Sequence, residues 1–220
     1  MGSLWRREGI GTVIGFSLPD EQQALREKAR RFADDVMKPR AAELDVTGTF
    51  PRDILEQAFN AGLMNQNIPK EYGGQGFSCL DDAIVVEELA VACMGITTGI
   101  MANALALTPI ILFGSDSQKE RYLRPYAQDF RLAAFCLTER DAGSDVQGIK
   151  TVAARDGDEY VLNGTKCFST NGGYADVFTV FALIDPAKGA RSLTAFIVEK
   201  NWGVEIGEAE DKMGPVSYTH

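Results

Sequence analysis

The hydrophobic period of this chain changes once, and that change restricts the fold more than any other feature. Over residues 17–128 apolar side chains recur three and four positions apart, as on one face of a helix. From residue 129 onward the apolar runs are short and bounded by turn residues, as in strands. The sequence therefore predicts an α+β chain, with an all-helical N-terminal domain over 17–128 and an antiparallel, barrel-like β domain over 129–214. Residues 1–16 show no period and are predicted to be a disordered extension.

Cap and breaker residues mark the expected helices. Ser17 is placed to cap a first helix, which Pro39 should stop or kink. Thr49-Phe50-Pro51 should open a second helix, and Ser115-x-x-Gln118 has the form of a capping box. Turn residues in the second half, including Asn163-Gly164, predict hairpins.

No charged residue occurs between Leu89 and Ser115. A membrane span needs about 20 apolar residues, so this run is long enough. Gly95 and Pro109 interrupt it, however, and no cluster of Lys or Arg flanks it. The run is therefore predicted to be a helix buried on nearly all sides of a soluble bundle, with no membrane insertion.

Composition excludes several classes of function. The chain has 31 acidic and 22 basic residues and a net charge of −9, which argues against binding to nucleic acid or anionic membranes. The one histidine is His220, so a Ser-His-Asp triad and a histidine-rich metal site are excluded. The four cysteines lack paired spacing and are predicted to be reduced thiols.

The point where the period changes also carries the most polar loop. Ala133 to Leu137 reads as a buried strand that delivers Thr138 and Glu139 at its end. Ala142-Gly143 permits a tight turn, and Ser144-Asp145 adds a hydroxyl and a carboxylate. Such a loop offers hydroxyls and backbone N–H groups to an anionic ligand. An ordinary turn between two domains fits the same residues equally well.

Two motifs resemble one known family. The first is similar at every defined position to a signature of the acyl-CoA dehydrogenase flavoenzymes, and reads Cys136-Leu137-Thr138-Glu139-x-x-Ala142-Gly143-Ser144-Asp145-x-x-Gly148. One departure is Arg140, where the family usually has proline. The second, Asn163 to Gly173, resembles the family's strand that lies against the flavin. The resemblance covers about residues 17 to 214 and is greatest to medium-chain-type members.

The resemblance implies a cofactor, FAD, and a role for each motif residue. Phe168 would stack beside the isoalloxazine ring, Thr170 would approach its reactive edge, and Thr138 would hydrogen-bond near flavin N5. β-propensity alone would also place the two threonines in strands. The flavin-binding residues implied are Phe135, Thr138, Gly143, Ser144, Phe168, Ser169 and Thr170. Those implied for the acyl-CoA substrate are Ser144, Thr98, Met101 and Leu105.

The resemblance also implies a reaction. Family enzymes remove the α-proton of a fatty acyl-CoA with a glutamate while the β-hydrogen leaves as hydride to flavin N5. In the medium-chain type this base lies in a C-terminal four-helix bundle, which the sequence lacks, and residues 215–220 form an atypical tail. No catalytic residue is therefore assigned, because the base is expected beyond the C-terminus. Glu139 is the one local acid that could be proposed as the base instead, but the signature gives it a turn-stabilising role. We therefore expect a truncated acyl-CoA dehydrogenase whose activity is absent or very weak when this chain is tested by itself.

Further expectations follow from the family. Its members pass electrons to electron-transfer flavoprotein, form homo-oligomers at full length, and occur in the bacterial cytoplasm or the mitochondrial matrix. Two alternatives stay open. The chain could be a non-catalytic flavin-binding, CoA-binding or interaction module with the same fold, or a sequence artefact without independent function. Acyl chain length is left undecided.

Overall fold

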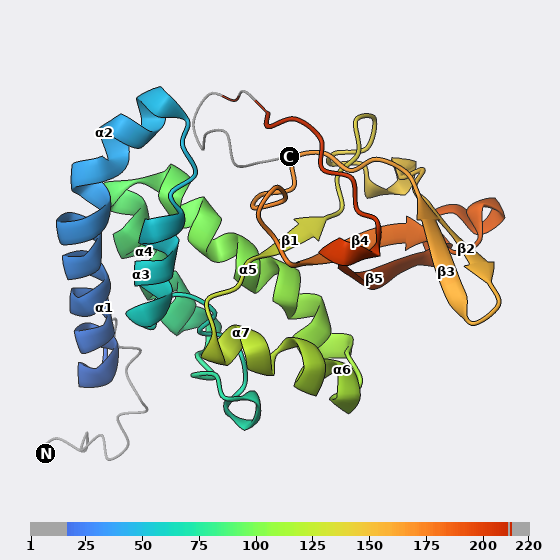
Figure 1. Cartoon of the computed structure of the whole chain (residues 1–220). Helices are drawn as coiled ribbons and strands as arrows, with labels where there is room; N and C mark the ends of the chain where they lie inside the picture. Colours follow the sequence, from blue (N-terminus) through green and yellow to red (C-terminus); the bar gives the residue numbers. More distant parts are fainter. Residues whose placement is uncertain (1–16, 211, 213–220) are drawn as a thin grey trace, which may run out of the picture.

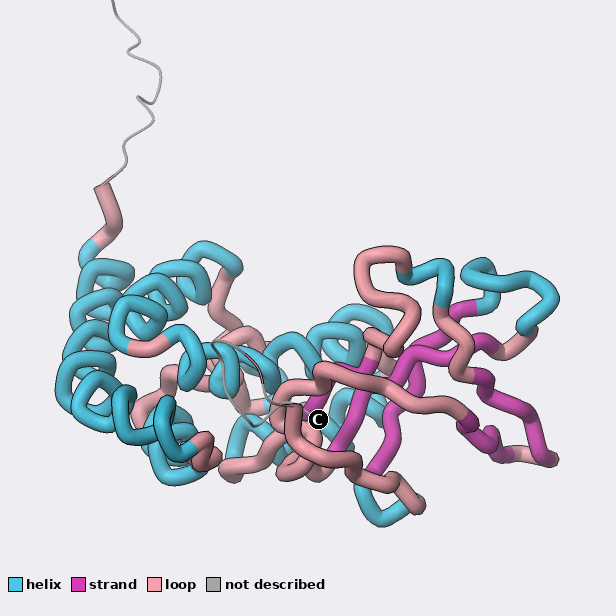
Figure 2. The backbone as a smooth tube through the Cα atoms, turned by 90° about the horizontal axis from the view of Figure 1, so that it is seen from above, coloured by secondary structure: helices cyan, strands magenta, loops and turns pink. Residues whose placement is uncertain are grey.

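A computed structural model describes residues 17–210 and residue 212, so the predicted extension over 1–16 and the tail over 215–220 lie outside the described residues. Helices gather at one end of the molecule and strands at the other (Figures 1 and 2). The predicted order, a helical domain followed by a β domain, is confirmed.

The helical domain contains α-helices separated by short connections. Their bounds are α1 Asp20–Phe32, α2 Lys38–Thr47, α3 Arg52–Asn60, α4 Cys79–Ala92, α5 Met94–Phe113, α6 Asp116–Tyr122 and α7 Arg124–Gln128.

The start of α1 and its passage into α2 differ from the sequence prediction. Pro19, not Ser17, is the N-cap residue, and no side chain caps the helix. Asp20 and Glu21 instead place negative charge in the first turn, where the helix dipole favours it. A π-helical segment, Ala33–Met37, then joins α1 to α2, and Pro39 lies in the first turn of α2, where its missing N–H is tolerated. The helix therefore continues through Pro39.

Other local predictions are confirmed. The Ser115 hydroxyl accepts from the Gln118 N–H at 3.3 Å, and the Gln118 side chain accepts from the Ser115 N–H at 2.8 Å, which completes the capping box of α6. The backbone N–H groups of Gly73, Gly74 and Gly76 all donate to carbonyls of residues 68–70. The glycine N–H groups of this loop are therefore used within the chain, which favours a connector over a phosphate site.

The sheet is mixed, whereas an antiparallel one was predicted. β2 pairs with β3, and β4 with β5, in antiparallel fashion, but β1 and β2 both run parallel to β4. Within the described residues the sheet stays open, and residues 204–206 form no strand. The strands are β1 Ala133–Cys136, β2 Val152–Asp156, β3 Glu159–Asn163, β4 Val177–Leu183 and β5 Leu193–Glu199.

Chain length between the strands accounts for the parallel pairing. Parallel neighbours need a connection of about a dozen residues or more. Residues 137–176, which include the β2–β3 hairpin, separate β1 from β4 and provide that length. Turn residues reveal a hairpin, but they carry no information about which distant strand pairs beside it.

The helix α5 lies next to the sheet (Figure 1), and polar groups of α5 bond to it. Asn103 is fully buried, and its side chain donates to the Arg131 carbonyl at 2.6 Å and accepts from the Ala133 N–H at 2.7 Å. The Thr179 hydroxyl of β4 donates to the Ala106 carbonyl at 2.7 Å. Residues 103 and 106 are one helical turn apart, so α5 holds β1 and β4 from a single face. We call these three hydrogen bonds the α5 seam.

The opposite face of α5 is exposed, so the prediction of a helix buried on nearly all sides is wrong. By length and composition α5 could cross a membrane, and half of it is buried inside the protein. Its buried face forms hydrogen bonds with β1 and β4, as expected for a helix in a protein core. The apolar side chains exposed on it are Met94, Met101, Leu105, Leu112 and Phe113.

Asn103→Leu is expected to destabilise the fold by about 2–5 kcal/mol. It leaves the Ala133 N–H and the Arg131 carbonyl without hydrogen-bond partners, and each unsatisfied group costs about 1–3 kcal/mol. Urea unfolding followed by circular dichroism measures the loss. Asn60→Leu, at the exposed end of α3, is the matched control and should change stability by less than about 0.5 kcal/mol. Equal effects of the two substitutions would contradict the importance of the seam.

Candidate functional site

The loop after β1 turns sharply and presents its polar residues outward. Glu139 and Ala142 exchange two backbone hydrogen bonds, each 3.1 Å, which close the turn around exposed Arg140. Gly143 and Ser144 then lie exposed, and a Cβ built on Gly143 would meet no atom within 4 Å. Nothing in the described chain requires glycine at 143. The open space beside it is available to a group from outside the chain.

The second motif lies beside this loop. The Cys167 N–H donates to the Thr138 carbonyl at 2.9 Å, so Thr138 and Phe168 stand on adjacent backbone segments. Phe168 adopts φ 57° and Asn171 φ 65°, both in the left-handed region that residues with side chains rarely occupy. The Phe168 side chain is nevertheless 52% exposed. An aromatic ring held in a strained backbone conformation and left uncovered is a feature of binding sites.

Buried polar atoms without partners follow Phe168. The Ser169 hydroxyl and the side-chain oxygen of Asn171 have no hydrogen-bond partner of normal geometry among the described residues, although both residues are buried. The Asn171 amide nitrogen donates to the Gly99 carbonyl of α5 at 2.8 Å. Thr170, between them, is half-buried. Unsatisfied buried oxygens are rare and call for a ligand or water.

A buried ion pair joins the two motifs. Lys166 Nζ donates to Glu139 Oε1 at 2.8 Å and to the Leu137 carbonyl at 3.0 Å. Glu139 also accepts from the Thr151 hydroxyl and from the N–H groups of Lys150 and Thr151. Burial alone would raise the pKa of Glu139, but these hydrogen bonds outweigh it and lower the pKa to about 2. Lys166 and Thr151 lie 27 and 12 positions from Glu139, so spacing in the sequence does not indicate them as its partners.

Gly164 permits this ion pair to form. A Cβ at position 164 would lie 2.3 Å from the Thr151 hydroxyl oxygen, so a larger residue would push Thr151 away from Glu139. Asn163-Gly164 was predicted to be a hairpin turn, which is wrong. The β2–β3 hairpin turns at residues 157–158, and β3 ends at Asn163.

The other predicted site residues are distributed over the sheet and α5. Thr98, Met101 and Leu105 share a face of α5 that is partly or largely exposed. The Asn171–Gly99 hydrogen bond attaches the second motif to this helix next to Thr98. Phe135 is half-buried, and its ring packs against Phe181 at 5.1 Å. The structure thus brings Thr138 close to Phe168 and joins both motifs to α5, while Ser144 lies out on the exposed loop.

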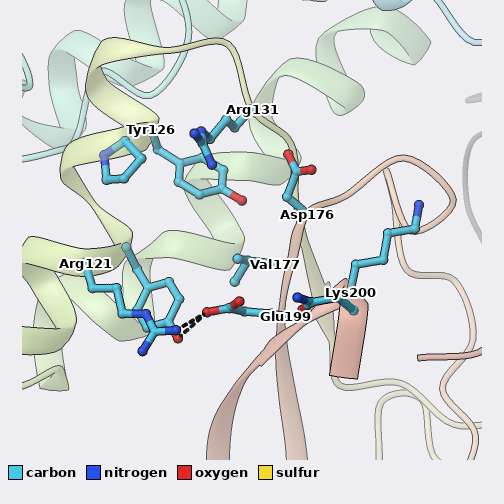
Figure 3. Close-up of a pocket in the computed structure, with 10 residues that line it drawn as sticks. Arg121, Tyr126, Arg131, Asp176, Val177, Glu199 and Lys200 are labelled. Carbon is cyan, nitrogen blue, oxygen red and sulfur yellow. Dashed lines mark hydrogen bonds and ion pairs between the residues drawn. The ribbon is translucent and has the colours of Figure 1, made fainter. Parts of the chain in front are cut away.

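A cavity of about 300 Å³ lies away from both motifs (Figure 3). It opens between α6–α7 and the adjoining ends of β4 and β5. Glu199 accepts from Arg121 at 2.6 Å and from the Tyr122 hydroxyl at 3.0 Å on one wall. Asp176 and Lys200 flank the opening. Arg121 and Glu199 pair with each other, and in the described part of the chain no cluster of His, Cys, Asp or Glu could hold a metal ion.

Comparison with known proteins identifies the family. The model of the acyl-CoA dehydrogenase N-terminal domain matches residues 19–129, and that of the middle domain matches residues 134–219. The chain belongs to the acyl-CoA dehydrogenase family. It is 40% identical over 205 residues to a probable medium-chain specific acyl-CoA dehydrogenase 2, mitochondrial, of Caenorhabditis briggsae, covering 91% of this chain and 50% of that relative.

Solved structures agree with this assignment. The chain resembles butyryl-CoA dehydrogenase from Megasphaera elsdenii with a TM-score of 0.86 and 37% identity, over 92% of this chain and 54% of that one. An acyl-CoA dehydrogenase complexed with FAD from Bacillus anthracis gives a TM-score of 0.81 and 33% identity, over 92% and 35%. The chain therefore spans about half the length of the curated relative it matches.

The ion pair predicts how stability depends on pH. The pKa of Glu139 is about 2 in the folded chain against an ordinary value of 4.5, so the carboxylate stabilises the fold above about pH 4.5 and loses this contribution as the pH falls toward 2. At about 1.4 kcal/mol per pKa unit the contribution is about 3 kcal/mol. The difference in unfolding free energy between wild type and Glu139→Gln should shrink by that amount between pH 6 and pH 2. A difference independent of pH would contradict the low pKa.

Proposed function

We propose that this chain binds FAD and forms the flavin-side half of an acyl-CoA dehydrogenase, which oxidises the α,β-bond of a fatty acyl-CoA thioester. The observation that carries the proposal is the direct contact of the two motifs: the Cys167 N–H donates to the Thr138 carbonyl at 2.9 Å. Residues separated by 29 positions in sequence thereby present one polar and one aromatic side chain at the same place.

The residues present fit a flavin. The exposed ring of Phe168 offers an apolar planar surface, on which a planar ring system such as that of a flavin can stack. The unpartnered Ser169 hydroxyl and the open space at Gly143 suit a polar ligand that approaches closely. When bound, FAD would supply the acceptor for the hydride that leaves the substrate's β-carbon. In this arrangement Thr138 would orient the ring through its hydroxyl, and Thr170 would stand near its reactive edge.

The substrate would lie between the motifs and α5. Thr98, Met101 and Leu105 form a largely apolar stripe suited to an acyl chain. Asn171 holds this helix against the second motif, which would bring an acyl group and a flavin into the same cleft. Ser144, on the exposed loop, would contact the CoA portion with its hydroxyl.

Glu139 is not suited to abstract the α-proton. Both oxygens of Glu139 are occupied by donors, and a pKa of about 2 makes it a very weak base. The base is proposed to come from outside the described residues. We further propose electron-transfer flavoprotein as electron acceptor, a homo-oligomer for the complete enzyme, and a location in the bacterial cytoplasm or the mitochondrial matrix.

The occupied state of Glu139 also favours a second candidate, a flavin- or CoA-binding module that carries out no chemistry. The two candidates share the binding site and differ in whether a base reaches the substrate. Binding and turnover must therefore be measured separately.

Thr138→Val tests the flavin site. The substitution keeps the branched shape and removes one hydroxyl, worth about 1 kcal/mol, so the Kd for FAD should rise about fivefold. The Kd comes from quenching of flavin fluorescence during titration with the 220-residue chain, whose own binding we expect to be weak. Thr165→Val, exposed in the neighbouring segment, is the control and should leave the Kd unchanged. Failure of the wild-type chain to bind FAD would contradict the proposal itself.

The 220-residue chain is expected not to reduce FAD with an acyl-CoA. A positioned base contributes about 10²–10⁴-fold, and the described motifs hold no suitable one. An anaerobic mixture of protein, FAD and octanoyl-CoA, followed at the flavin absorbance band, should not bleach within an hour. Bleaching that persists in Glu139→Gln would mean that another base exists in this chain.

A further inference from the structure

The contacts of the Glu139 carboxylate join three segments of the chain, two that supply the donors and its own. Lys150 and Thr151 precede β2, Lys166 follows β3, and Glu139 itself lies just after β1. The side chains of Glu139 and Lys166 are only 9% and 10% exposed. Buried hydrogen bonds between ionised groups are stronger than those between neutral groups, provided that every lone pair and proton of the network has a partner.

The backbone atoms that carry the two motif side chains adjoin these contacts. Lys166 also bonds to the Leu137 carbonyl, one residue before Thr138. The next residue, Cys167, bonds to the Thr138 carbonyl and directly precedes Phe168. The ion pair therefore holds both backbone segments within one residue of the groups that the proposed function assigns to the flavin.

We propose that Glu139 is a positioning residue, whose buried pairing with Lys166 and Thr151 fixes Thr138 and Phe168 in place before the flavin binds. This inference rests on the proposed function. It assigns to the buried carboxylate of the first motif a role that is neither that of a base nor that of a direct ligand. Its low pKa agrees, because the group stays ionised at every pH at which the protein would work.

Charge, and not shape alone, is what the position requires. The Lys166 ammonium, the Thr151 hydroxyl and the N–H groups of Lys150 and Thr151 all donate to the carboxylate. In Glu139→Gln an amide NH₂ would face one of these donors, and Lys166 would remain buried without a counter-charge. Removing one partner of a buried pair is far more damaging than removing both. A double variant can therefore separate loss of stability from loss of positioning.

The experiment compares wild type, Glu139→Gln, the double variant Glu139→Gln/Lys166→Met, and Asp141→Asn, each in the full 220-residue chain. Asp141 pairs with Lys150 at 3.1 Å on the surface of the same loop and serves as the matched control. Three quantities are measured: exchange of the Cys167 amide hydrogen without flavin, the Kd for FAD, and the urea midpoint of unfolding. The Cys167 amide does not bond to Glu139, so its exchange reports on the contact between the motifs.

Glu139→Gln should accelerate Cys167 exchange at least tenfold and weaken FAD binding by about 10–100-fold, as for outer-shell partners of other bound groups. Asp141→Asn should change neither. The double variant should regain most of the urea midpoint without regaining FAD affinity. Recovery of both together, or unchanged exchange and affinity in Glu139→Gln, would overturn the proposal. If wild type binds no FAD, the proposed function fails, and Cys167 exchange alone still decides whether Glu139 orders the motifs.

Discussion

The α5 seam is the constraint on which the rest of the structure depends. Asn103 satisfies a carbonyl and an N–H at the entry to β1, and the Ala106 carbonyl accepts from Thr179 of β4. Two strands far apart in sequence, which pair in parallel, are thereby both held on one helix. A third contact, from Asn171 to Gly99, attaches the loop of the second motif to the same helix. The proposed site is thus built outward from α5.

Features with local causes could be predicted from the sequence. The capping box at Ser115 depends on residues three positions apart, and the connector role of the Gly73–Gly76 loop follows from nearby glycines. The order of helical and β domains follows from the period of the apolar residues. The cap at Ser17 was wrong because Asp20 and Glu21 begin the helix at Pro19 without any side-chain cap. The π-helical turn at Ala33–Met37 leaves no signal in apolar spacing.

Features with distant causes could not be predicted in this way. Turn residues show that a hairpin exists but not that β1 will lie parallel to β4, because the two strands are separated by residues 137–176. The α5 helix looked fully buried because its sequence is apolar all round, yet the described residues cover one face. Gly164 was predicted as a hairpin residue, whereas its lack of a side chain serves the approach of Thr151 to Glu139.

In the candidate site too, features with local causes could be predicted from the sequence and features with distant causes could not. Motif resemblance singled out Thr138, Phe168 and Ser144, and their side chains or segments are accessible in the structure. The ion pair of Glu139 with Lys166 spans 27 positions, so neither period nor turn chemistry could indicate it. This ion pair is a buried, fully paired charge. It holds two backbone segments where a planar ligand would meet an uncovered aromatic ring.

The most direct test of this account is a map of FAD contacts on the backbone. Amide chemical shifts of the ¹⁵N-labelled 220-residue chain would be recorded during titration with FAD. The account predicts that the largest changes fall on residues 138–144 and 167–171, with little change in α1 or along the walls of the cavity beside Glu199. Changes centred on that cavity, or spread evenly over the surface, would contradict it.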